Sequence, residues 1–444
     1  MTDQAPGVAP STVPKVSDGY RRYAMTVLLV IYILNFVDRQ VINILAEPIK
    51  NELGLMDWQL GMLTGLAFAV LYTVLGLPIA RLAERRHRPA IIAISLATWS
   101  FFTALCGLAQ NFLQLVLARV GVGVGEAGCT PAAHSLIADY VPREERASAI
   151  AFYSMGTPLG SLVGLAIGGM IADAYGWRMA FIVCGLPGLV FALIAGFTLI
   201  EPRLKQVGVA AVAHSAPYRE VVAELFRKRT FWQIAVGTSV VAFIGYGHAP
   251  FTASFFFRIH AAELASLAEL FGLKSGGFLG IALGLGTGLG GAIGAFIGGQ
   301  LADRLGKRDI RYWMVVPSLG TLASLPIYAA MLWAPNVPLA LGLLSLSTVV
   351  ASLWYGPIYA TAQSISPIRT RATASAVLLF IINLIGLGLG PLLVGVLSDF
   401  CAISLGMGKG EGVRWALLIS TLPAVIACAV FWRARGTIKQ DMED

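Results

Sequence analysis

Two adjacent ionisable residues, Asp38 and Arg39, lie in the middle of an apolar run from Tyr23 to Ala46. An ionisable residue at the centre of a membrane-spanning helix costs about 2.5 to 3.5 kcal/mol on insertion scales, so such residues normally face a water-filled cavity and pair with other groups. This position indicates that Asp38 and Arg39 line a pathway through a membrane. The alternative is a structural ion pair that holds this helix against a neighbour.

A second pair of charges, Arg119 and Glu126, lies in another apolar run, Leu117–Ala127. Seven residues make almost two turns of an α-helix, so both side chains share one helix face, about 10 Å apart. We expect both to face the same cavity as Asp38 and Arg39.

Carboxylates and arginines in a site of low dielectric constant can link proton binding to anion binding. In general, burial raises the pKa of a carboxyl group and a nearby arginine lowers it. If Asp38 and Glu126 release protons when the arginines are free, and bind them when an anion occupies the arginines, the two binding events are coupled. The pattern allows either carboxylate to carry the proton. The planar guanidinium suits a phosphate or carboxylate head group, and Asn35 is placed to orient Asp38.

The composition indicates a polytopic membrane protein. Of the 444 residues, 57% are hydrophobic and 13% are charged, and the mean hydropathy is +0.75, which leaves too little polar surface for a soluble globule. The net charge of +8 comes from basic residues in short loops, so no continuous basic face predicts a nucleic-acid partner. The five cysteines have neither metal-ligand nor redox spacing. We expect no metal and no cofactor.

Membrane spans need about 20 mostly apolar residues, and twelve stretches meet this requirement. They lie near residues 24–47, 58–83, 89–109, 112–140, 146–174, 177–200, 230–258, 277–303, 311–333, 336–364, 368–400 and 412–434. The polar stretch 201–229 divides them into six and six. We therefore expect an all-α membrane protein with an N-terminal tail (1–23), a six-helix bundle (24–200), a linker (201–229), a second six-helix bundle (230–434) and a C-terminal tail (435–444).

Basic residues gather in the loops that follow the second, fourth, eighth and tenth spans. The positive-inside rule places these loops, the linker and both termini in the cytoplasm. On the opposite side, residues 259–273 are too short and too charged to span a membrane. Their apolar residues recur at helical spacing, which predicts a short helix at the membrane surface.

The two halves of the chain resemble each other. Gly299–Arg308 follows the eighth span as Ala80–Arg88 follows the second, and Pro367–Ala374 precedes the eleventh span as Pro142–Ala149 precedes the fifth. Such repetition predicts two bundles related by an axis along the membrane normal, with the substrate site between them near mid-membrane.

Glycines recur every four residues in several spans, as in Gly280, Gly284 and Gly288, and in Gly156, Gly160 and Gly164. Small residues at this spacing let neighbouring helices approach closely. No strand precedes the Gly-x-Gly-x-Gly segments, so dinucleotide-binding loops are excluded.

These features resemble the major facilitator superfamily over nearly the whole chain. Gly299–Arg308 is similar to the superfamily's cytoplasmic loop signature, and the first-half copy departs from it at Ala80, Glu84 and His87. We expect Glu84 and Asp303 to pair with loop arginines and helix N-termini, which would latch the cytoplasmic side in an outward-facing state. The alternative is that these residues only set topology. The expected gate comprises Arg81, Glu84, Arg85, Asp303 and Arg304.

Within the superfamily, Asn35–Arg39, Arg119 and Gly125–Ala127 resemble the spinster-like branch, as does the fifth-span segment Phe152–Ser161. This resemblance implies a bacterial inner-membrane transporter, not an enzyme, that uses the proton gradient to move a lysophospholipid or sphingoid-type lipid with an anionic head group. The alternatives are a proton-coupled carrier of a soluble organic anion or drug, and an uncoupled lipid scramblase. We expect membrane lipids and protons as partners, and a monomer.

The second half lacks comparable mid-span charges but is rich in aromatic residues. A charged wall opposite an apolar, aromatic wall would suit an amphiphile, whereas the alternative is that the rings pack against lipid or other helices. We expect Asp38 and Glu126 to couple protons. The residues expected to bind substrate are Arg39, Arg119, Asn35, Tyr246, Trp354, Tyr355 and Tyr359.

Overall fold

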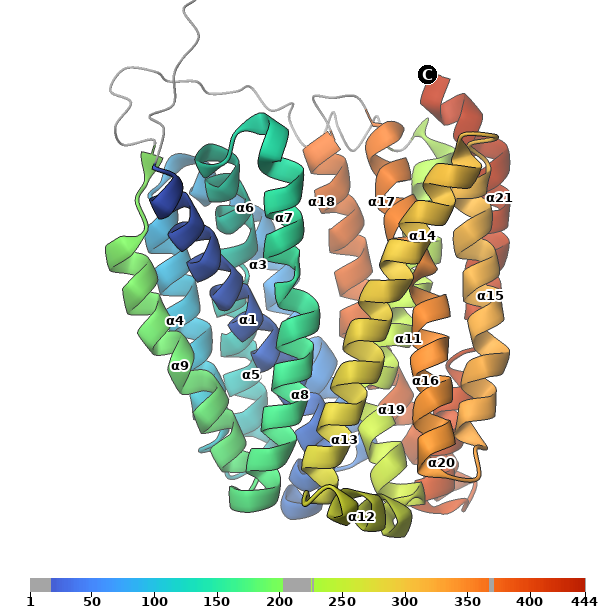
Figure 1. The fold of residues 1–444 in the computed structure, drawn as a ribbon. Helices are drawn as coiled ribbons and strands as arrows, with labels where there is room; N and C mark the ends of the chain where they lie inside the picture. The colour runs from blue at the N-terminus through green and yellow to red at the C-terminus, as the bar shows by residue number, and fades with distance from the viewer. Residues whose placement is uncertain (1–16, 203–224, 226, 367–370, 444) are drawn as a thin grey trace, which may run out of the picture.

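The structure is a computed structural model that describes residues 17–202, 225, 227–366 and 371–443. In this part of the chain, twelve helices are long and apolar enough to cross a membrane. They form two six-helix bundles that stand side by side (Figure 1). Each crossing helix overlaps one of the twelve predicted spans, so the predicted fold is confirmed.

The N-terminal half contains the first six spans, several of which are broken into shorter helices. Its elements are α1 (Asp18–Leu53), α2 (Asp57–Gly61), the π-helix η1 (Met62–Leu66), α3 (Ala67–Arg85), α4 (Arg88–Cys106), α5 (Phe112–Glu126), α6 (Cys129–Tyr140), the short η2 (Arg143–Glu145), α7 (Arg146–Ser154), α8 (Gly156–Tyr175) and α9 (Trp177–Thr198).

The C-terminal half repeats this pattern. Its elements are α11 (Arg229–Ile259), α12 (Ala261–Leu270), α13 (Ser275–Leu283), η4 (Gly284–Leu289), α14 (Gly290–Gly306), α15 (Tyr312–Leu332), α16 (Val337–Ala351), η5 (Ser352–Trp354), α17 (Tyr355–Ser364), α18 (Arg371–Ile382), η6 (Asn383–Leu389), α19 (Gly390–Asp399), η7 (Phe400–Ser404), α20 (Gly408–Ile419) and α21 (Ala424–Glu443). The short helix α12 lies across one end of the bundle (Figure 1), where the sequence predicts a surface helix.

Local signals in the sequence set several helix ends. The side chains of Asn111 and Asn336 accept hydrogen bonds from the first turns of α5 and α16, as N-cap residues do. Gly54 ends α1 with a φ of 65°, a left-handed conformation that favours glycine.

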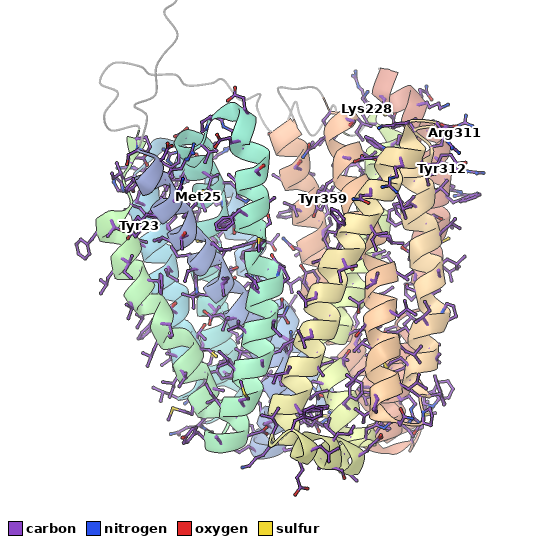
Figure 2. The ribbon with its side chains drawn as sticks, in the orientation of Figure 1. Tyr23, Met25, Lys228, Arg311, Tyr312 and Tyr359 are labelled. Carbon is purple, nitrogen blue, oxygen red and sulfur yellow. The ribbon has the colours of Figure 1, made fainter. Side chains whose placement is uncertain are left out.

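Lys228, Arg311 and Tyr312 lie at the end of the molecule opposite α12, near the C-terminus, and Tyr359 lies deeper between the helices (Figure 2). We call this end the terminal end, and the opposite one the α12 end.

The glycine repeats allow the close helix contacts that the sequence predicts. A Cβ atom added at Gly280 would collide with the backbone carbonyl of Leu165 in α8, and one at Gly160 would collide with the carbonyl of Ile33 in α1. The helix α8 is therefore held between α1 of its own half and α13 of the other half, at a separation that only glycine permits.

Three π-helical segments lie where the two halves meet. A Cβ atom at Gly65 in η1 would contact the carbonyls of Leu387 and Gly388 in η6, and one at Gly284 in η4 would contact Leu162 in α8. Single π-helical turns occur frequently at functional sites. Here they occur in the second, eighth and eleventh spans, which form the seam between the halves together with the fifth span.

The seam leads to a testable prediction. Gly280→Ala should lower the free energy of unfolding by about 1–3 kcal/mol, because the added methyl group overpacks the contact with Leu165. The matched control is Gly342→Ala in α16, where a Cβ atom would meet open space and should raise stability by up to about 1 kcal/mol. Unfolding in mixed detergent micelles measures both changes, and equal effects would contradict this account of the seam.

Candidate functional site

The structure brings four charged residues together inside the N-terminal half. Asp38 and Arg39 come from α1, and Arg119 and Glu126 come from α5. Asp38, Arg119 and Glu126 are each only 1% exposed. The expectation that Arg119 and Glu126 face an open cavity is therefore wrong for this conformation, because aromatic side chains of α1 and α3 cover the cluster.

Arg39 forms the direct ion pair of this cluster. Its Nε donates to the Oε2 of Glu126 at 2.5 Å, and its guanidinium lies 4.5 Å from the ring centroid of Tyr72 and 5.0 Å from that of Phe68. The Arg39 side chain keeps 17% of its surface exposed. It is therefore the charged group of the cluster that solute can reach.

Arg119 is bound differently. Its Nε donates to the backbone carbonyl of Leu63 at 3.4 Å and its Nη1 to that of Asp38 at 3.5 Å, both long for hydrogen bonds. Its guanidinium also lies 5.4 Å from the Phe68 centroid. Among the described residues it contacts no carboxylate, so most of its donor capacity is unused.

The Asp38 carboxyl lies beside Trp99 and Thr103 of α4. Trp99 and Thr103 lie close enough to donate to this carboxyl, but the Asp38 Oδ1 makes no well-formed hydrogen bond with a described residue, and the same is true of the Glu126 Oε1. The amide of Asn35 lies against Glu126, so it is placed to orient Glu126, whereas the sequence suggests Asp38.

The four predicted aromatic residues of the second half divide into two groups. Trp354 is only 6% exposed and packs in the core of its own bundle, so the structure does not support Trp354 as a lining residue. Tyr355 stacks on Trp354 with centroids 3.9 Å apart and stays 43% exposed, and Tyr246 is 38% exposed. Tyr246 lies within electrostatic range of both Arg39 and Tyr359.

Two tyrosines of the first half, which are not among the predicted site residues, also belong to this region. Tyr32 and Tyr72 lie within electrostatic range of Arg39 and Tyr246. The signal for Tyr32 was present, because Tyr32, Phe36 and Arg39 follow the i, i+4, i+7 spacing of one helix face.

The predicted gate residues lie at the terminal end. Asp303 and Arg304 are exposed and form no ion pair with any described residue. Arg81 is exposed and has a partner. The side chains of Glu84 and Arg85 lie outside what the structure describes, so the latch remains a prediction for the state that is closed at this end.

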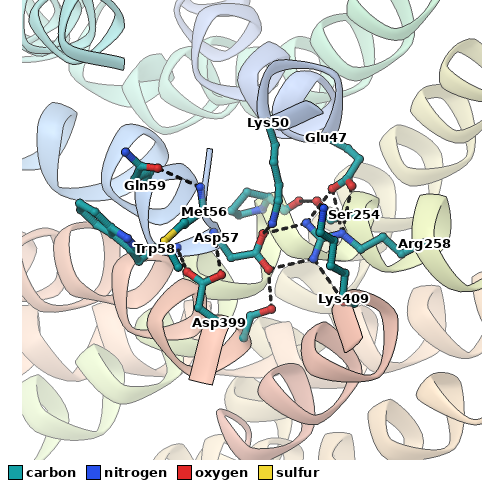
Figure 3. Close-up of polar contacts among 12 residues, drawn as sticks. Glu47, Lys50, Met56, Asp57, Trp58, Gln59, Ser254, Arg258, Asp399 and Lys409 are labelled. Carbon is teal, nitrogen blue, oxygen red and sulfur yellow. Dashed lines mark hydrogen bonds and ion pairs between the residues drawn. The ribbon is translucent and has the colours of Figure 1, made fainter. Parts of the chain in front are cut away.

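A second cluster of buried charges lies at the α12 end and joins the two halves (Figure 3). Arg258, near the end of α11, contacts both carboxylate oxygens of Asp57 at 2.8 Å. The same guanidinium binds Glu47 of α1 at 2.8 to 3.0 Å, and Lys50 pairs with Asp57. Arg258 thus bridges carboxylates of the opposite half.

The sequence alone does not predict this second cluster. Glu47, Lys50, Asp57 and Arg258 lie near the ends of spans, where charged residues usually meet the polar head groups of lipids. These residues are buried together only because the two halves pack against each other at this end.

The described intramembrane histidines lie apart from both clusters. The Nε2 of His248 is 2.9 Å from the Ser420 hydroxyl, and its ring stacks on Tyr328. His134 packs edge-on against Tyr153. These contacts support structural roles for both.

Comparisons with known proteins agree with this fold. The model of the Major Facilitator Superfamily matches residues 28–391. An MFS-type efflux pump of Mycolicibacterium smegmatis (strain ATCC 700084 / mc(2)155) is 35% identical over 94% of both chains. Protein spinster homolog 3 of Danio rerio is 27% identical, over 90% of this chain and 81% of the relative.

A solved structure is also similar. It is a bacterial homologue of the human lysosomal transporter Spinster in an inward-facing and unoccupied conformation, with a TM-score of 0.84 and 33% identity over 96% of this chain and 99% of that one. The occupied, inward-facing form of that homologue gives a TM-score of 0.81.

The second cluster leads to a prediction about stability. Arg258→Met should cost about 3–5 kcal/mol of unfolding free energy, because it leaves the carboxylates of Asp57 and Glu47 buried with fewer partners. The control is Arg178→Met at the same end, which breaks an exposed pair with Glu52 and a hydrogen bond to the Ala109 carbonyl and should cost about 1–2 kcal/mol. Unfolding in mixed micelles separates the two, and a loss below 1 kcal/mol for Arg258→Met would contradict a buried bridge.

Proposed function

Since the chain belongs to the Major Facilitator Superfamily, in the branch that includes the spinster proteins, we propose that it is a proton-coupled secondary transporter of an amphiphilic lipid that works by alternating access. It is a multi-pass membrane protein, and its family and fold are those of transporters rather than enzymes. The expected lipid is a lysophospholipid or sphingoid-type molecule with an anionic head group. The observation that carries the proposal is a buried cluster of two arginines and two carboxylates from which Arg39 alone is partly exposed.

The geometry favours Asp38 over Glu126 as the proton carrier. Glu126 is already paired with Arg39 through its Oε2, whereas Asp38 forms no ion pair with any described residue and has only the neutral donors of Thr103 and Trp99 beside it. A buried carboxylate without an ion pair is costly when ionised. In this conformation Asp38 holds a proton, and it releases the proton when Arg119 turns from the backbone carbonyls to the Asp38 carboxylate.

Arg39 is the anchor for the anionic head group. Its Nε is used by Glu126, and Tyr72 also lies within hydrogen-bonding range, so the other N–H groups of the guanidinium would make the paired hydrogen bonds to phosphate or carboxylate. Tyr246, Tyr355 and Tyr359 of the opposite half provide an amphipathic surface for the rest of the molecule. Arg119, being buried, acts on Asp38 rather than on the substrate.

The conformation is proposed to be inward-facing. The hydrogen bonds between described residues that join the two halves lie at the α12 end. If the basic loops mark the cytoplasmic side of the bacterial inner membrane, the termini are cytoplasmic and the outer side is closed.

Two other functions remain alternatives. The similarity to an MFS-type efflux pump favours a proton-coupled carrier of a drug or soluble organic anion. A lipid scramblase would move lipid without coupling, so neutralising Asp38 should leave its activity unchanged.

The first test is uptake of labelled lysophosphatidylglycerol into proteoliposomes that contain the purified protein, with and without an imposed pH gradient of either sign. One pH unit drives about tenfold accumulation for each coupled proton. Asp38→Asn should abolish this accumulation. Exchange of the lipid measured without a pH gradient should remain partly intact. Glu269→Gln, which changes an exposed carboxylate of α12, should behave as the wild type.

The other outcomes are equally informative. Equal movement with and without the gradient in both Asp38→Asn and wild type would indicate a scramblase. Protein-independent movement only would redirect the search to soluble anions. Full gradient-driven accumulation by Asp38→Asn would remove Asp38 from the coupling role.

A second prediction concerns the head group. Arg39→Lys should raise the KM for lysophosphatidylglycerol about tenfold, because lysine keeps the charge but cannot make the paired hydrogen bonds. Transport of an uncharged monoacylglycerol should change little. Equal losses for both lipids would indicate that Arg39 is structural.

A further inference from the structure

The two halves exchange a pair of equivalent contacts at the α12 end. The first is made by Asp399, the last residue of α19. Its Oδ1 accepts from the backbone N–H of Asp57 at 3.0 Å, and its Oδ2 from that of Trp58 at 2.8 Å. These N–H groups begin the second span, where no preceding helical turn provides acceptors. A carboxylate of the C-terminal half therefore caps a helix of the N-terminal half (Figure 3).

The second contact runs in the opposite direction. Asp173, near the end of α8, accepts from the N–H of Gly276 at 3.2 Å through Oδ1 and from that of Gly277 at 2.7 Å through Oδ2. Lys274 donates to the Asp173 carbonyl at 2.9 Å. A carboxylate of the N-terminal half thus caps the start of α13 in the C-terminal half.

The same small sequence pattern precedes both carboxylates. Gly169 lies four residues before Asp173, and Gly395 lies four residues before Asp399. A Cβ atom at Gly169 would collide with the carbonyl of Gly276, and one at Gly395 would collide with that of Asp57. In each contact the glycine lets the two helix backbones approach closely. The aspartate one turn later then caps the start of the helix in the opposite half.

The two contacts are related by the internal repeat. Asp173 lies near the end of the fifth span and Asp399 near the end of the eleventh, and the helices they cap begin the eighth and second spans. We propose that these reciprocal caps hold the α12 end closed, and that both must break when the molecule opens there. The inference rests on the alternating access proposed above, and it adds the residues that determine which end is open.

Each cap contributes charge as well as hydrogen bonds. The N-terminus of a helix carries a partial positive charge that favours a carboxylate. In the open state the two N–H groups and the carboxylate return to water, so removing the aspartate reduces the advantage of the closed state over the open state, while the Arg258 bridge at the same end remains.

The test measures the distance between spin labels on the two halves, by double electron–electron resonance in lipid nanodiscs without substrate or pH gradient. Asn51→Cys and Leu270→Cys provide exposed labelling positions at the α12 end, and the native cysteines are buried or half-buried. Asp173→Ala or Asp399→Ala should each raise the ratio of long to short distances about fivefold, the usual effect of losing a helix cap.

The matched control is Glu52→Ala. Glu52 lies at the same end but pairs with Arg178 and Trp177 of its own half, so its removal should leave the distance ratio unchanged. The double variant Asp173→Ala/Asp399→Ala should shift the ratio further than either single variant. Asp173→Asn and Asp399→Asn keep a capping oxygen, so they should fold and give smaller shifts in the same direction.

Distances that move no more in the alanine and asparagine variants than in Glu52→Ala would overturn the proposal. Because no substrate and no gradient are present, such a result would leave the substrate and coupling proposals untouched. Likewise, if the uptake experiment showed no coupled lipid transport, the distance measurement would still test the two caps.

Discussion

The arrangement of this molecule depends on the cost of placing charge in a medium of low dielectric constant. Each charged group in a span needs a partner, because an isolated ion there is costly. In the N-terminal half, two arginines and two carboxylates share one buried cluster, and Arg39 pairs with Glu126. At the α12 end, Arg258 binds two carboxylates of the other half. Any change in protonation or in the contact between halves must therefore rearrange these partners.

The two charged clusters share structural elements. The helix α1 carries Asp38 and Arg39 at its middle and Glu47 and Lys50 near its end. Arg119 donates to the carbonyl of Leu63 in η1, and η1 lies in the same span as Asp57. If Arg119 turned toward Asp38, it would release the Leu63 carbonyl. Leu63 lies in the second span, whose first residue, Asp57, bonds to the other half. The two charged clusters thus share two structural elements, α1 and the second span.

The sequence predicts local features well and the seam poorly. Hydrophobic length alone locates the twelve spans, and helical spacing correctly brings Arg119 and Glu126 to the charges on α1. It does not predict that Arg119 is sealed while Arg39 stays partly exposed, because that depends on where Phe68 and Tyr72 pack. Asp173, Asp399 and Arg258 look like ordinary charges at span ends until the second half is placed against the first. An aromatic residue such as Trp354 suits either a cavity wall or a bundle core, and only the packing shows that Trp354 belongs to the core.

The seam and the central region are built from different kinds of contact. At the α12 end the halves meet through glycines and capped helix ends, so the contact involves backbone atoms and tolerates little change. Near Arg39 the halves face each other through side chains such as Tyr72 and Tyr246. A fold of this kind can keep one closing mechanism while its solute changes. The chain is similar both to an efflux pump and to spinster proteins, and under the proposed function the side chains around Arg39 are where a difference in substrate would arise.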